Sequence, residues 1–344
     1  MSVPIRVART ETLLLTTGRQ YRAAVMATIG DLPYPPDEVR GIVERIRLVP
    51  DAMRTFSQTS TAATRTHRIR PELLAHLLDL GLPHRTDGGE LSFDEFDLSN
   101  VGVALDLPCA RRMAMRWWAK ALAGMVPGNR TVYSVDSTAS CPSPGHPGPC
   151  PFVLEPRVVE AMRAGSLREH APGRYSFDVE LTGRTHHFGA AFAPLVERAK
   201  AMRFHLLPIN HPMAFDLGLL AETGLADCRL ATKALARLAD ELRLPVRPAI
   251  GYLMAPPYPQ AHGWIEFKEE GRWWPADPFL LNALAGWGIV DPGLWPPDRS
   301  PEGLLWRLSE RGFREIAHGD ATVFPKMAIV GRSHTPTGDP RGAG

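Results

Sequence analysis

Three residues in the second half of the 344-residue chain have the types and order of a nucleophilic catalytic triad: Cys228, His262 and Asp277. A thiolate attacks an acyl carbon, an imidazole holds that thiolate and later protonates the leaving group, and a carboxylate fixes the tautomer of the imidazole. Taken singly, each of these residues is usually structural, because such cysteines pack, strand histidines are hydrogen-bonded and an aspartate before proline forms turns. Their significance therefore depends on the elements that carry them.

The residues after Cys228 have the apolar spacing of one helical face, and Asp227 precedes them as a helix N-cap. The helix is expected to end before Leu244-Pro245, because proline disfavours helical backbone in the residue before it. Cys228 then lies in the first turn, where free N–H groups and the helix dipole stabilise a thiolate, although the charge of Asp227 opposes this effect. The apolar stripe comprises Ala231, Ala234, Leu235, Leu238, Ala239 and Leu242.

Two strands joined by a tight turn at 269–271 are expected to carry His262 and Asp277. If Glu269 and Glu270 alone form the loop, counting back along both strands places His262 opposite Asp277 on the same face of the hairpin. A longer loop places the two residues on a diagonal instead. In the first arrangement the imidazole and the carboxylate can hydrogen-bond directly, and the spacing alone does not fix which arrangement forms. The hairpin is the element that we expect to orient the histidine.

Several motifs surround these residues, namely Leu244-Pro245-Val246-Arg247, Gly251-Tyr252, His262-Gly263-Trp264-Ile265-Glu266 and Trp273-Trp274-Pro275-Ala276-Asp277-Pro278. With spacings of 34 and 15 residues within the triad, the stretch from about 200 to 285 resembles the catalytic core of the transglutaminase-like superfamily. The resemblance covers about a quarter of the chain. It implies an α+β fold with a papain-like core, in which the cysteine-bearing helix packs on an antiparallel sheet. It also implies that Cys228 is the nucleophile, His262 the general base and acid, and Asp277 the orienting residue.

The stretch departs from the papain pattern at the oxyanion hole, because the six positions before Cys228 contain Glu222 and no glutamine. Donors must surround the developing negative charge. Our candidates are the backbone N–H of Cys228 and a donor from the segment 204–211, with Asn210, His205 and His211 as its side chains. No dense acidic cluster indicates a calcium site, and we expect neither a metal nor a cofactor.

A Cys-His-Asp triad forms an acyl-enzyme, and the acceptor decides the reaction. The chain is similar to stand-alone homologues in bacterial specialised-metabolite pathways, including antibiotic biosynthesis. This similarity implies an amide-forming acyltransferase that takes an acyl group from a thioester, such as one on an acyl carrier protein, and transfers it to an amine. Trp264, Trp273 and Trp274 are candidates for a substrate wall that excludes water, with core packing as the alternative. A cysteine peptidase or amidase that uses water, and a binding module with an inactive triad, are the other two hypotheses.

The composition bears on partners and location. Thirty-nine basic residues against 37 acidic ones give a net charge of +2, which makes nucleic acid an unlikely partner. Arg111, Arg112 and Arg116 follow a faint helix-turn-helix pattern at 99–108, and they form either a solvated helix face or a docking face for an acidic carrier protein. No stretch approaches the ~20 apolar residues of a membrane span, and the first 18 residues lack a secretory signal core. We expect a soluble, cytoplasmic protein without a membrane partner.

Helical periodicity and the distribution of proline and glycine predict four regions. Residues 1–125 are expected to be mainly helical, with helices near 36–46, 71–80 and 109–125, and residues 126–190 to be a Pro/Gly-rich loop and connecting segment. Residues 191–330 form the predicted catalytic core, and residues 331–344 a frayed tail.

The segment 140–150 contains three potential soft metal ligands, Cys141, His146 and Cys150. Their spacing matches no standard zinc motif, and no fourth ligand is evident nearby. An ordinary proline-rich loop is therefore the favoured interpretation.

Overall fold

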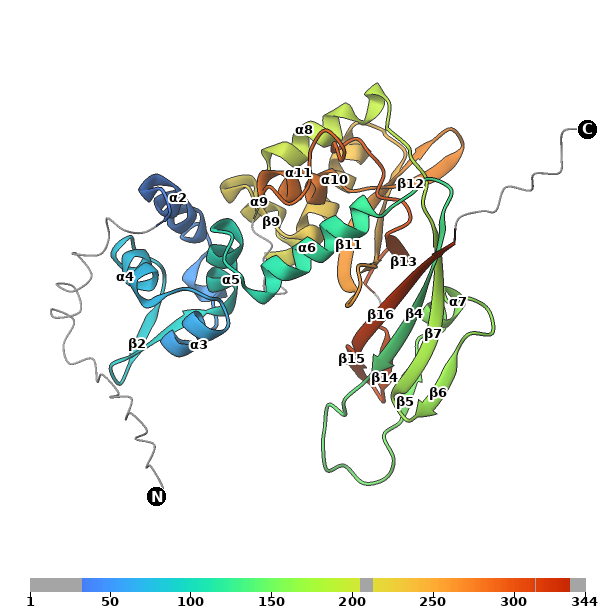
Figure 1. Cartoon of the computed structure of the whole chain (residues 1–344), viewed down its shortest axis with the longest axis horizontal. Helices are drawn as coiled ribbons and strands as arrows, with labels where there is room; N and C mark the ends of the chain where they lie inside the picture. Colours follow the sequence, from blue (N-terminus) through green and yellow to red (C-terminus); the bar gives the residue numbers. More distant parts are fainter. Residues whose placement is uncertain (1–32, 205–212, 313, 335–344) are drawn as a thin grey trace, which may run out of the picture. The chain divides into compact units, whose positions relative to one another are not determined.

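The computed structural model describes residues 33–204, 213–312 and 314–334 (Figure 1). The chain divides into two compact units, the first ending at Leu107 and the second beginning at Pro108. The sequence analysis placed this boundary after residue 125. The predicted helix at 109–125 is present as α6 (Ala110–Ala123), but it belongs to the second unit.

The first unit combines helices with a small antiparallel sheet. The helices are α2 (Pro36–Ile46), α3 (Ser60–Arg65), α4 (Pro71–Asp79) and α5 (Glu95–Ala104), with a short 3-10 turn η2 (Asp51–Met53). The strands β1 (Phe56–Thr59), β3 (Glu90–Asp94) and β2 (Arg85–Asp87) lie in that order. Helix α2 buries the predicted face, Val39, Ile42, Val43 and Ile46, against the core of this unit. The described residues of this unit, 33–107, contain more helix than strand, and the sheet was not predicted.

The central sheet of the second unit is antiparallel, with strand order β12-β11-β10-β13. Its strands are β10 (Val246–Leu253), β11 (Gln260–Glu269), β12 (Arg272–Ala276) and β13 (Leu305–Ser309). Helix α10 (Cys228–Glu241) packs on β10 and β11, and it contacts α8 (Ala193–Ala201) and α11 (Pro278–Gly286), as Figure 1 shows. The predicted arrangement of a cysteine-bearing helix on an antiparallel sheet is therefore present.

Short elements lead into α10. The 3-10 turn η3 (Ala190–Phe192) precedes α8, and the 3-10 turn η4 (Met213–Phe215) precedes α9 (Leu217–Thr223). Strand β8 (Arg203–Phe204) pairs in parallel with β9 (Leu225–Ala226), which runs directly into Asp227 and α10. This parallel pair lies directly before the start of α10, the helix that carries Cys228.

The region 126–190 is more ordered than predicted. It contributes β4 (Arg130–Thr138), β5 (Phe152–Leu154), α7 (Pro156–Glu160), β6 (Arg168–Ala171) and β7 (Arg174–Thr182). The expectation of a loop and connecting segment holds mainly for 139–151 and for 183–189, which contain no named helix or strand. Strand β4 pairs with the distant strand β16, whereas β6 and β7 form a local hairpin that the sequence analysis also missed.

Strand β16 (Lys326–His334) completes a four-stranded sheet of order β16-β4-β7-β6. The prediction of a frayed tail from residue 331 is therefore wrong for residues 331–334, whose backbone pairs with β4. Residues 335–344 lie outside the described part of the chain. A third sheet, of order β15-β14-β5, joins β14 (Ile316–His318) and β15 (Ala321–Val323) to β5.

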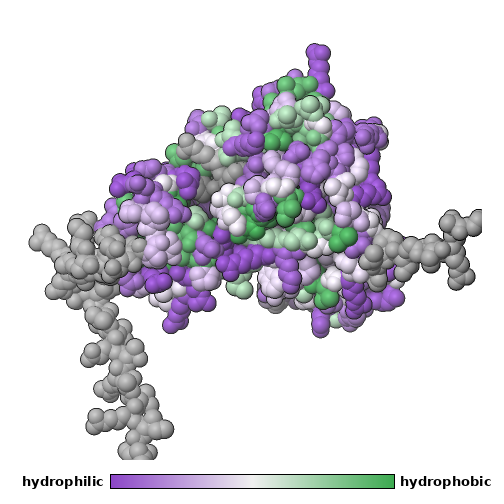
Figure 2. All heavy atoms as spheres, turned by 45° about the horizontal axis from the view of Figure 1, so that its top comes forward, coloured by the Kyte–Doolittle hydropathy of each residue, from purple (hydrophilic) through white to green (hydrophobic). Residues whose placement is uncertain are grey.

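The predicted α+β class is confirmed at this level, because helices accompany sheets that are antiparallel apart from the short β8–β9 pair. Within the described ranges, no helix has the length and apolar character needed to cross a lipid bilayer. On the face drawn in Figure 2, hydrophobic atoms form separate patches among mainly hydrophilic ones.

Candidate active site

Cys228 is the first residue of α10, as predicted. The Asp227 carboxylate caps this helix, because its Oδ1 accepts hydrogen bonds of 2.9 Å from the backbone N–H groups of both Arg229 and Leu230. Its other oxygen, Oδ2, forms an ion pair with the Arg229 guanidinium at 2.8 Å. The arginine offsets the negative charge that the sequence analysis placed beside the thiolate, and its role was missed.

The buried face of α10 holds the helix against the sheet. Leu230, Ala231, Ala234, Leu235 and Ala239 of the predicted stripe or its neighbours are buried, whereas Leu242, which follows the helix, is exposed. Gly263 on β11 permits close approach, since a Cβ atom there would lie 3.2 Å from Thr232 Oγ1 and 3.5 Å from the backbone oxygen of Cys228. The first turn of α10 therefore lies directly against the strand that carries His262.

His262 and Asp277 form a buried pair, with 2.5 Å between His262 Nε2 and Asp277 Oδ2. The register of the hairpin differs from the predicted one by two residues, because Glu269 pairs with Arg272. Continuing that register places Asp277 opposite Trp264, so His262 lies on the diagonal. A shift by two keeps side chains on the same face, which is why the predicted hydrogen bond still forms.

The reason for the shift lies in the turn. Its central residues are Glu270 and Gly271, whose φ angles are 53° and 77°. Positive φ at both central positions is the requirement of the type I′ turn, whose twist matches that of natural strands, and glycine adopts it without strain. The predicted loop of Glu269 and Glu270 would have put two glutamates at these positions.

Asp277 also begins the next helix. Its Oδ1 accepts a hydrogen bond of 3.0 Å from the backbone N–H of Leu280, so that the carboxylate caps α11 while Oδ2 binds His262. The carboxylate is thereby fixed from two sides, and it holds the imidazole with Nε2 toward Asp277. Nδ1 is the ring nitrogen that remains for the thiol.

Electrostatics favour the protonated imidazole. Burial alone would lower the pKa of His262, but the charge of Asp277, the charge of Cys228 and hydrogen bonds to both side chains raise it to about 10. Cys228 is half-buried, whereas His262 and Asp277 are buried. The arrangement can therefore hold an imidazolium against a partly accessible sulfur, which is the charge distribution of an activated thiol nucleophile.

The three candidate tryptophans lie in different surroundings. Trp264 is buried, and its ring is stacked near that of His262, with 6.2 Å between centroids. Trp273 lies beneath the Arg247 guanidinium at 4.4 Å, and Trp274 stacks on His186 at 4.1 Å. Among the recorded ring contacts, Trp264 is thus the member of the predicted wall that touches the triad.

The candidates for the oxyanion hole are only partly described. Asn210, His205 and His211 lie outside the described residues. The backbone N–H of Cys228 lies at the first position of α10, where helix geometry leaves it without an intrahelical partner. It is therefore available to a negatively charged oxygen formed at the carbon that Cys228 attacks.

A buried charge network was missed in the sequence. Glu266 on β11 is buried, and its Oε2 accepts hydrogen bonds from Arg247 Nε at 2.6 Å and Arg307 Nε at 3.0 Å. These arginines belong to β10 and β13, so the carboxylate ties three strands of the central sheet together. The presence of Arg247 and Glu266 in the quoted motifs was the available signal. Arg307 could not be found in this way, because it lies 41 residues after Glu266.

The structure removes one residue, Arg112, from the suggested docking face on α6. Arg112 is buried, and its Nη2 donates a hydrogen bond of 2.9 Å to the backbone oxygen of Trp287. A guanidinium that is held inside the second unit is not presented to an acidic partner. Sequence spacing grouped Arg112 with Arg111 and Arg116 on one face. Spacing does not show that a long side chain at the edge of a helix can extend inward.

The remaining cysteines fall into two groups. Cys109 is buried, whereas Cys141 and Cys150 are half-buried and form a cluster with His146 and His318. Two cavities in the described part of the chain, of about 290 Å³ and 520 Å³, border α6, and neither has a triad residue in its wall.

No protein-family model matches the chain, and no curated protein matches it either.

Proposed function

We propose that the protein is an acyltransferase with a cysteine nucleophile and a transglutaminase-like catalytic core, which forms amides by transferring acyl groups from thioesters to amines. The observation that carries the proposal is the buried His262–Asp277 pair beside Cys228 at the start of α10, with a raised histidine pKa. The sequence motifs around these residues and the packing of α10 on β10 and β11 give it further support.

In the first half-reaction, the Cys228 thiolate attacks the thioester carbonyl carbon and forms a carbon–sulfur bond. The carbonyl oxygen becomes negatively charged and accepts a hydrogen bond from the Cys228 N–H. When the tetrahedral intermediate collapses, the bond to the original sulfur breaks, and the departing thiolate takes a proton from the His262 imidazolium. The acyl group is then bound to Cys228, and His262 is neutral.

In the second half-reaction, an amine attacks the acyl carbon and its proton passes to neutral His262. Collapse of the second tetrahedral intermediate breaks the bond to Cys228, releases the amide and restores the thiolate–imidazolium pair. Asp277 keeps Nε2 oriented toward itself throughout, so that Nδ1 serves both proton transfers. Water in place of the amine gives hydrolysis, which is the peptidase or amidase alternative.

The first prediction concerns covalent capture. When the full chain is incubated with a simple acyl-thioester without amine, intact mass spectrometry is expected to show one acyl group per chain, and peptide mapping to place it on Cys228. The Cys228→Ala variant is expected to remain unmodified. An unmodified wild-type chain would support the inactive binding module, and an adduct on another cysteine would contradict the proposed nucleophile.

The acceptor is identified by how the acyl-enzyme divides between amide and free acid. In a series of amine concentrations, the ratio of amide to free acid is expected to rise with amine, because both acceptors react with the same acyl-enzyme. A product that stays entirely hydrolysed at the highest amine concentration would favour the peptidase or amidase. An acyl carrier protein and a small thioester with the same acyl group, compared as donors, test whether the protein recognises the carrier.

A further inference from the structure

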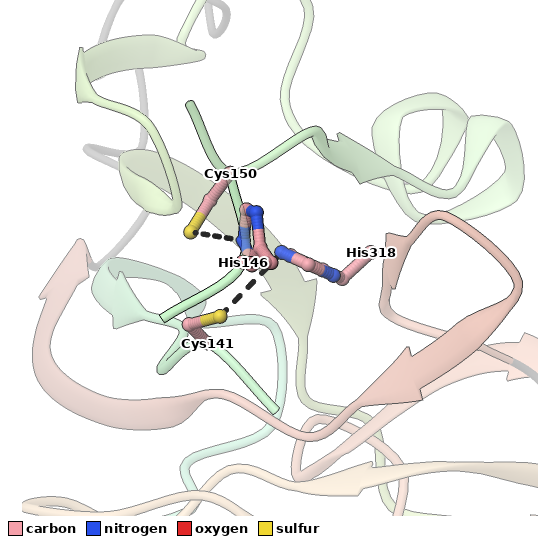
Figure 3. Close-up of side chains that lie close together, drawn as sticks. All are labelled: Cys141, His146, Cys150 and His318. Atoms are coloured by element: carbon pink, nitrogen blue, oxygen red, sulfur yellow. Dashed lines mark hydrogen bonds between the residues drawn. The ribbon is translucent and has the colours of Figure 1, made fainter. Parts of the chain in front are cut away.

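Outside the triad, four side chains that commonly bind metals converge at one place. Cys141, His146 and Cys150 come from the loop 139–151, and His318 is the last residue of β14 (Figure 3). All four are half-buried, while the other residues of 142–149 are exposed. The loop therefore directs its metal-binding side chains inward and its prolines and glycines outward.

Two of the distances between ligand atoms match those around one tetrahedral ion. Cys141 Sγ lies 3.7 Å from His318 Nε2, and Cys150 Sγ lies 3.4 Å from His146 Nε2. The four ligand atoms, one from each side chain, all lie within 4.8 Å of one another. Zinc–sulfur and zinc–nitrogen bonds of about 2.3 and 2.0 Å in a tetrahedron place neighbouring ligand atoms roughly 3.3 to 3.8 Å apart.

The strand register accounts for the fourth ligand. His318 is the pairing partner of Phe152 in the β14–β5 ladder, and Cys150 precedes Phe152 by two residues. The sheet thus fixes His318 beside the end of the loop, although it is 177 residues from Cys141 in the sequence. The Phe152 ring contacts the His318 ring, with 5.0 Å between centroids, which restricts the orientation of the imidazole.

The groups that surround the four side chains also suit a metal site. His146 Nδ1 lies 3.1 Å from the backbone oxygen of Pro147, so that the carbonyl can accept the Nδ1 proton and leave Nε2 unprotonated toward the cluster. Metal-binding histidines usually make such a hydrogen bond through the nitrogen that does not bind the metal. The rings of His146 and His318 meet edge to face at 5.0 Å, which keeps their ligand nitrogens close.

We propose that Cys141, His146, Cys150 and His318 bind one zinc ion as a structural site. Two sulfur and two nitrogen ligands in a tetrahedron are typical of zinc. Binding releases the two thiol protons, and the two thiolates neutralise the Zn²⁺ charge while both imidazoles stay neutral. With four protein ligands the ion keeps no open position for substrate, so the site stabilises the fold and is separate from the triad.

The function that we propose for the ion is to order the loop 139–151. The interior of the described loop has one backbone hydrogen bond, from His146 N–H to Ser143 O at 3.4 Å, and the others lie at its ends, from Ala139 N–H to Gly173 O and from Phe152 N–H to Cys150 O. Such a segment has little secondary structure to order it. A zinc ion would connect the loop that leaves β4 to the β14–β5 ladder, and so join two sheets of the second unit.

The second prediction concerns metal content. The full chain, expressed with zinc and purified under reducing conditions, is expected to contain about one zinc per chain by elemental mass spectrometry. After zinc is replaced by cobalt(II), we expect the intense visible absorption of tetrahedral cobalt and sulfur-to-metal charge-transfer bands. The spectrum tests the ligand set in the unaltered chain, and therefore does not depend on whether a variant folds.

Substitutions assign the ligands. Cys141→Ser and Cys150→Ser are each expected to weaken zinc binding by more than about 100-fold, since even loss of a second-shell partner costs 10- to 100-fold. Cys141→His, which restores a ligand, is expected to bind more zinc than Cys141→Ser. Cys228→Ser and His170→Gln are the matched controls, a cysteine and a histidine outside the cluster, and both are expected to keep their zinc.

Three results would overturn the proposal. A reduced chain that neither contains nor takes up zinc or cobalt rules out the site. A disulfide between Cys141 and Cys150 that persists in reductant, seen as the loss of two titratable thiols, assigns the sulfurs to a crosslink. Zinc that is lost in Cys228→Ser but retained in Cys141→Ser places the ion elsewhere.

Discussion

Asp277 is the residue on which two parts of the candidate active site depend. One carboxylate oxygen binds His262 Nε2, and the other caps α11 through the backbone N–H of Leu280. An asparagine keeps the capping oxygen but removes the negative charge from the histidine. The Asp277→Asn variant therefore separates the electrostatic role of the residue from its structural role, whereas Asp277→Ala removes both.

The sign of the pH effect follows from the raised pKa. The pKa of His262 is about 10, against an ordinary value of 6.5, because the charges and hydrogen bonds of Asp277 and Cys228 outweigh burial. Between these values the folded chain holds a proton that the unfolded chain has released. The stabilisation is complete below pH 6.5 and is lost as the pH rises through about 10.

The third prediction follows from this. In the wild-type chain, the free energy of unfolding measured in urea should fall between pH 7 and pH 10. The fall should be smaller in Asp277→Asn, which lacks the carboxylate charge that raises the pKa of His262 more than the charge of Cys228 does. Acylation of Cys228 should slow by about 100-fold or more in the variant, as for the loss of general acid–base catalysis. Equal pH slopes in the two proteins, with equal acylation rates, would contradict the role of Asp277.

At the residue scale, local spacing predicts where a side chain lies in its helix or strand better than it predicts contacts with residues that are distant in the sequence. Asp227 as N-cap, Cys228 at the helix start and the His262–Asp277 bond follow from local spacing, and the structure contains them. His318 could not be found in this way, because its position beside Cys150 depends on the β14–β5 pairing, to which local periodicity gives no access. Buried Arg112 shows the same limit, since its partner Trp287 lies 175 residues away.

At the element scale, the central sheet depends on a close contact between β10 and β13. A Cβ atom on Gly251 would lie 1.9 Å from the backbone oxygen of Trp306, at a point where the register between the strands shifts. A backbone oxygen within a sheet cannot turn aside as a flexible side chain can. Gly251, which was noted in the sequence only as part of a motif, is therefore required for β13 to pair with β10.

The fourth prediction is that Gly251→Ala destabilises the protein by about 3 kcal/mol, the cost of overpacking a site that cannot relax. The matched control is Gly286→Ala in α11, where a Cβ atom meets nothing within 4 Å and the backbone is helical. This control is expected to be neutral or stabilising by up to about 1 kcal/mol. Urea denaturation measures both variants, and a Gly251→Ala chain as stable as the control would show that β13 can shift at little cost.

The elements that were predicted well are those with strong local signals. Helices α2, α4, α6 and α10 follow from apolar periodicity and from capping or proline residues at their ends. The sheet β16-β4-β7-β6 was missed because β4 and β16 pair across almost 200 residues, and because the proline-rich loop between β4 and β5 dominated the composition of that region. The predicted hairpin register was wrong by two residues, because the prediction did not anticipate the positive φ angles at Glu270 and Gly271.

At the scale of the whole molecule, the second unit contains two chemically different candidate sites. The triad lies on α10, β11 and the start of α11, whereas the Cys/His cluster lies on the loop 139–151 and β14. The two sites share no residue and no secondary-structure element. If the cluster holds a structural zinc ion, its removal should affect the stability of the chain before it affects the chemistry of Cys228.

The fifth prediction tests that separation. A chelator is expected to lower the melting temperature of the wild-type chain by several degrees, since about 1 kcal/mol corresponds to 2–4 °C in a unit of this size. Acylation of Cys228 at 25 °C, well below melting, should proceed at the same rate with and without chelator. In Cys150→Ser, which lacks one proposed ligand, chelator should leave the melting temperature unchanged. A chelated wild-type chain that keeps its melting temperature but loses acylation would instead assign the metal to the reaction, because a stabilising ion cannot be removed without a thermal shift.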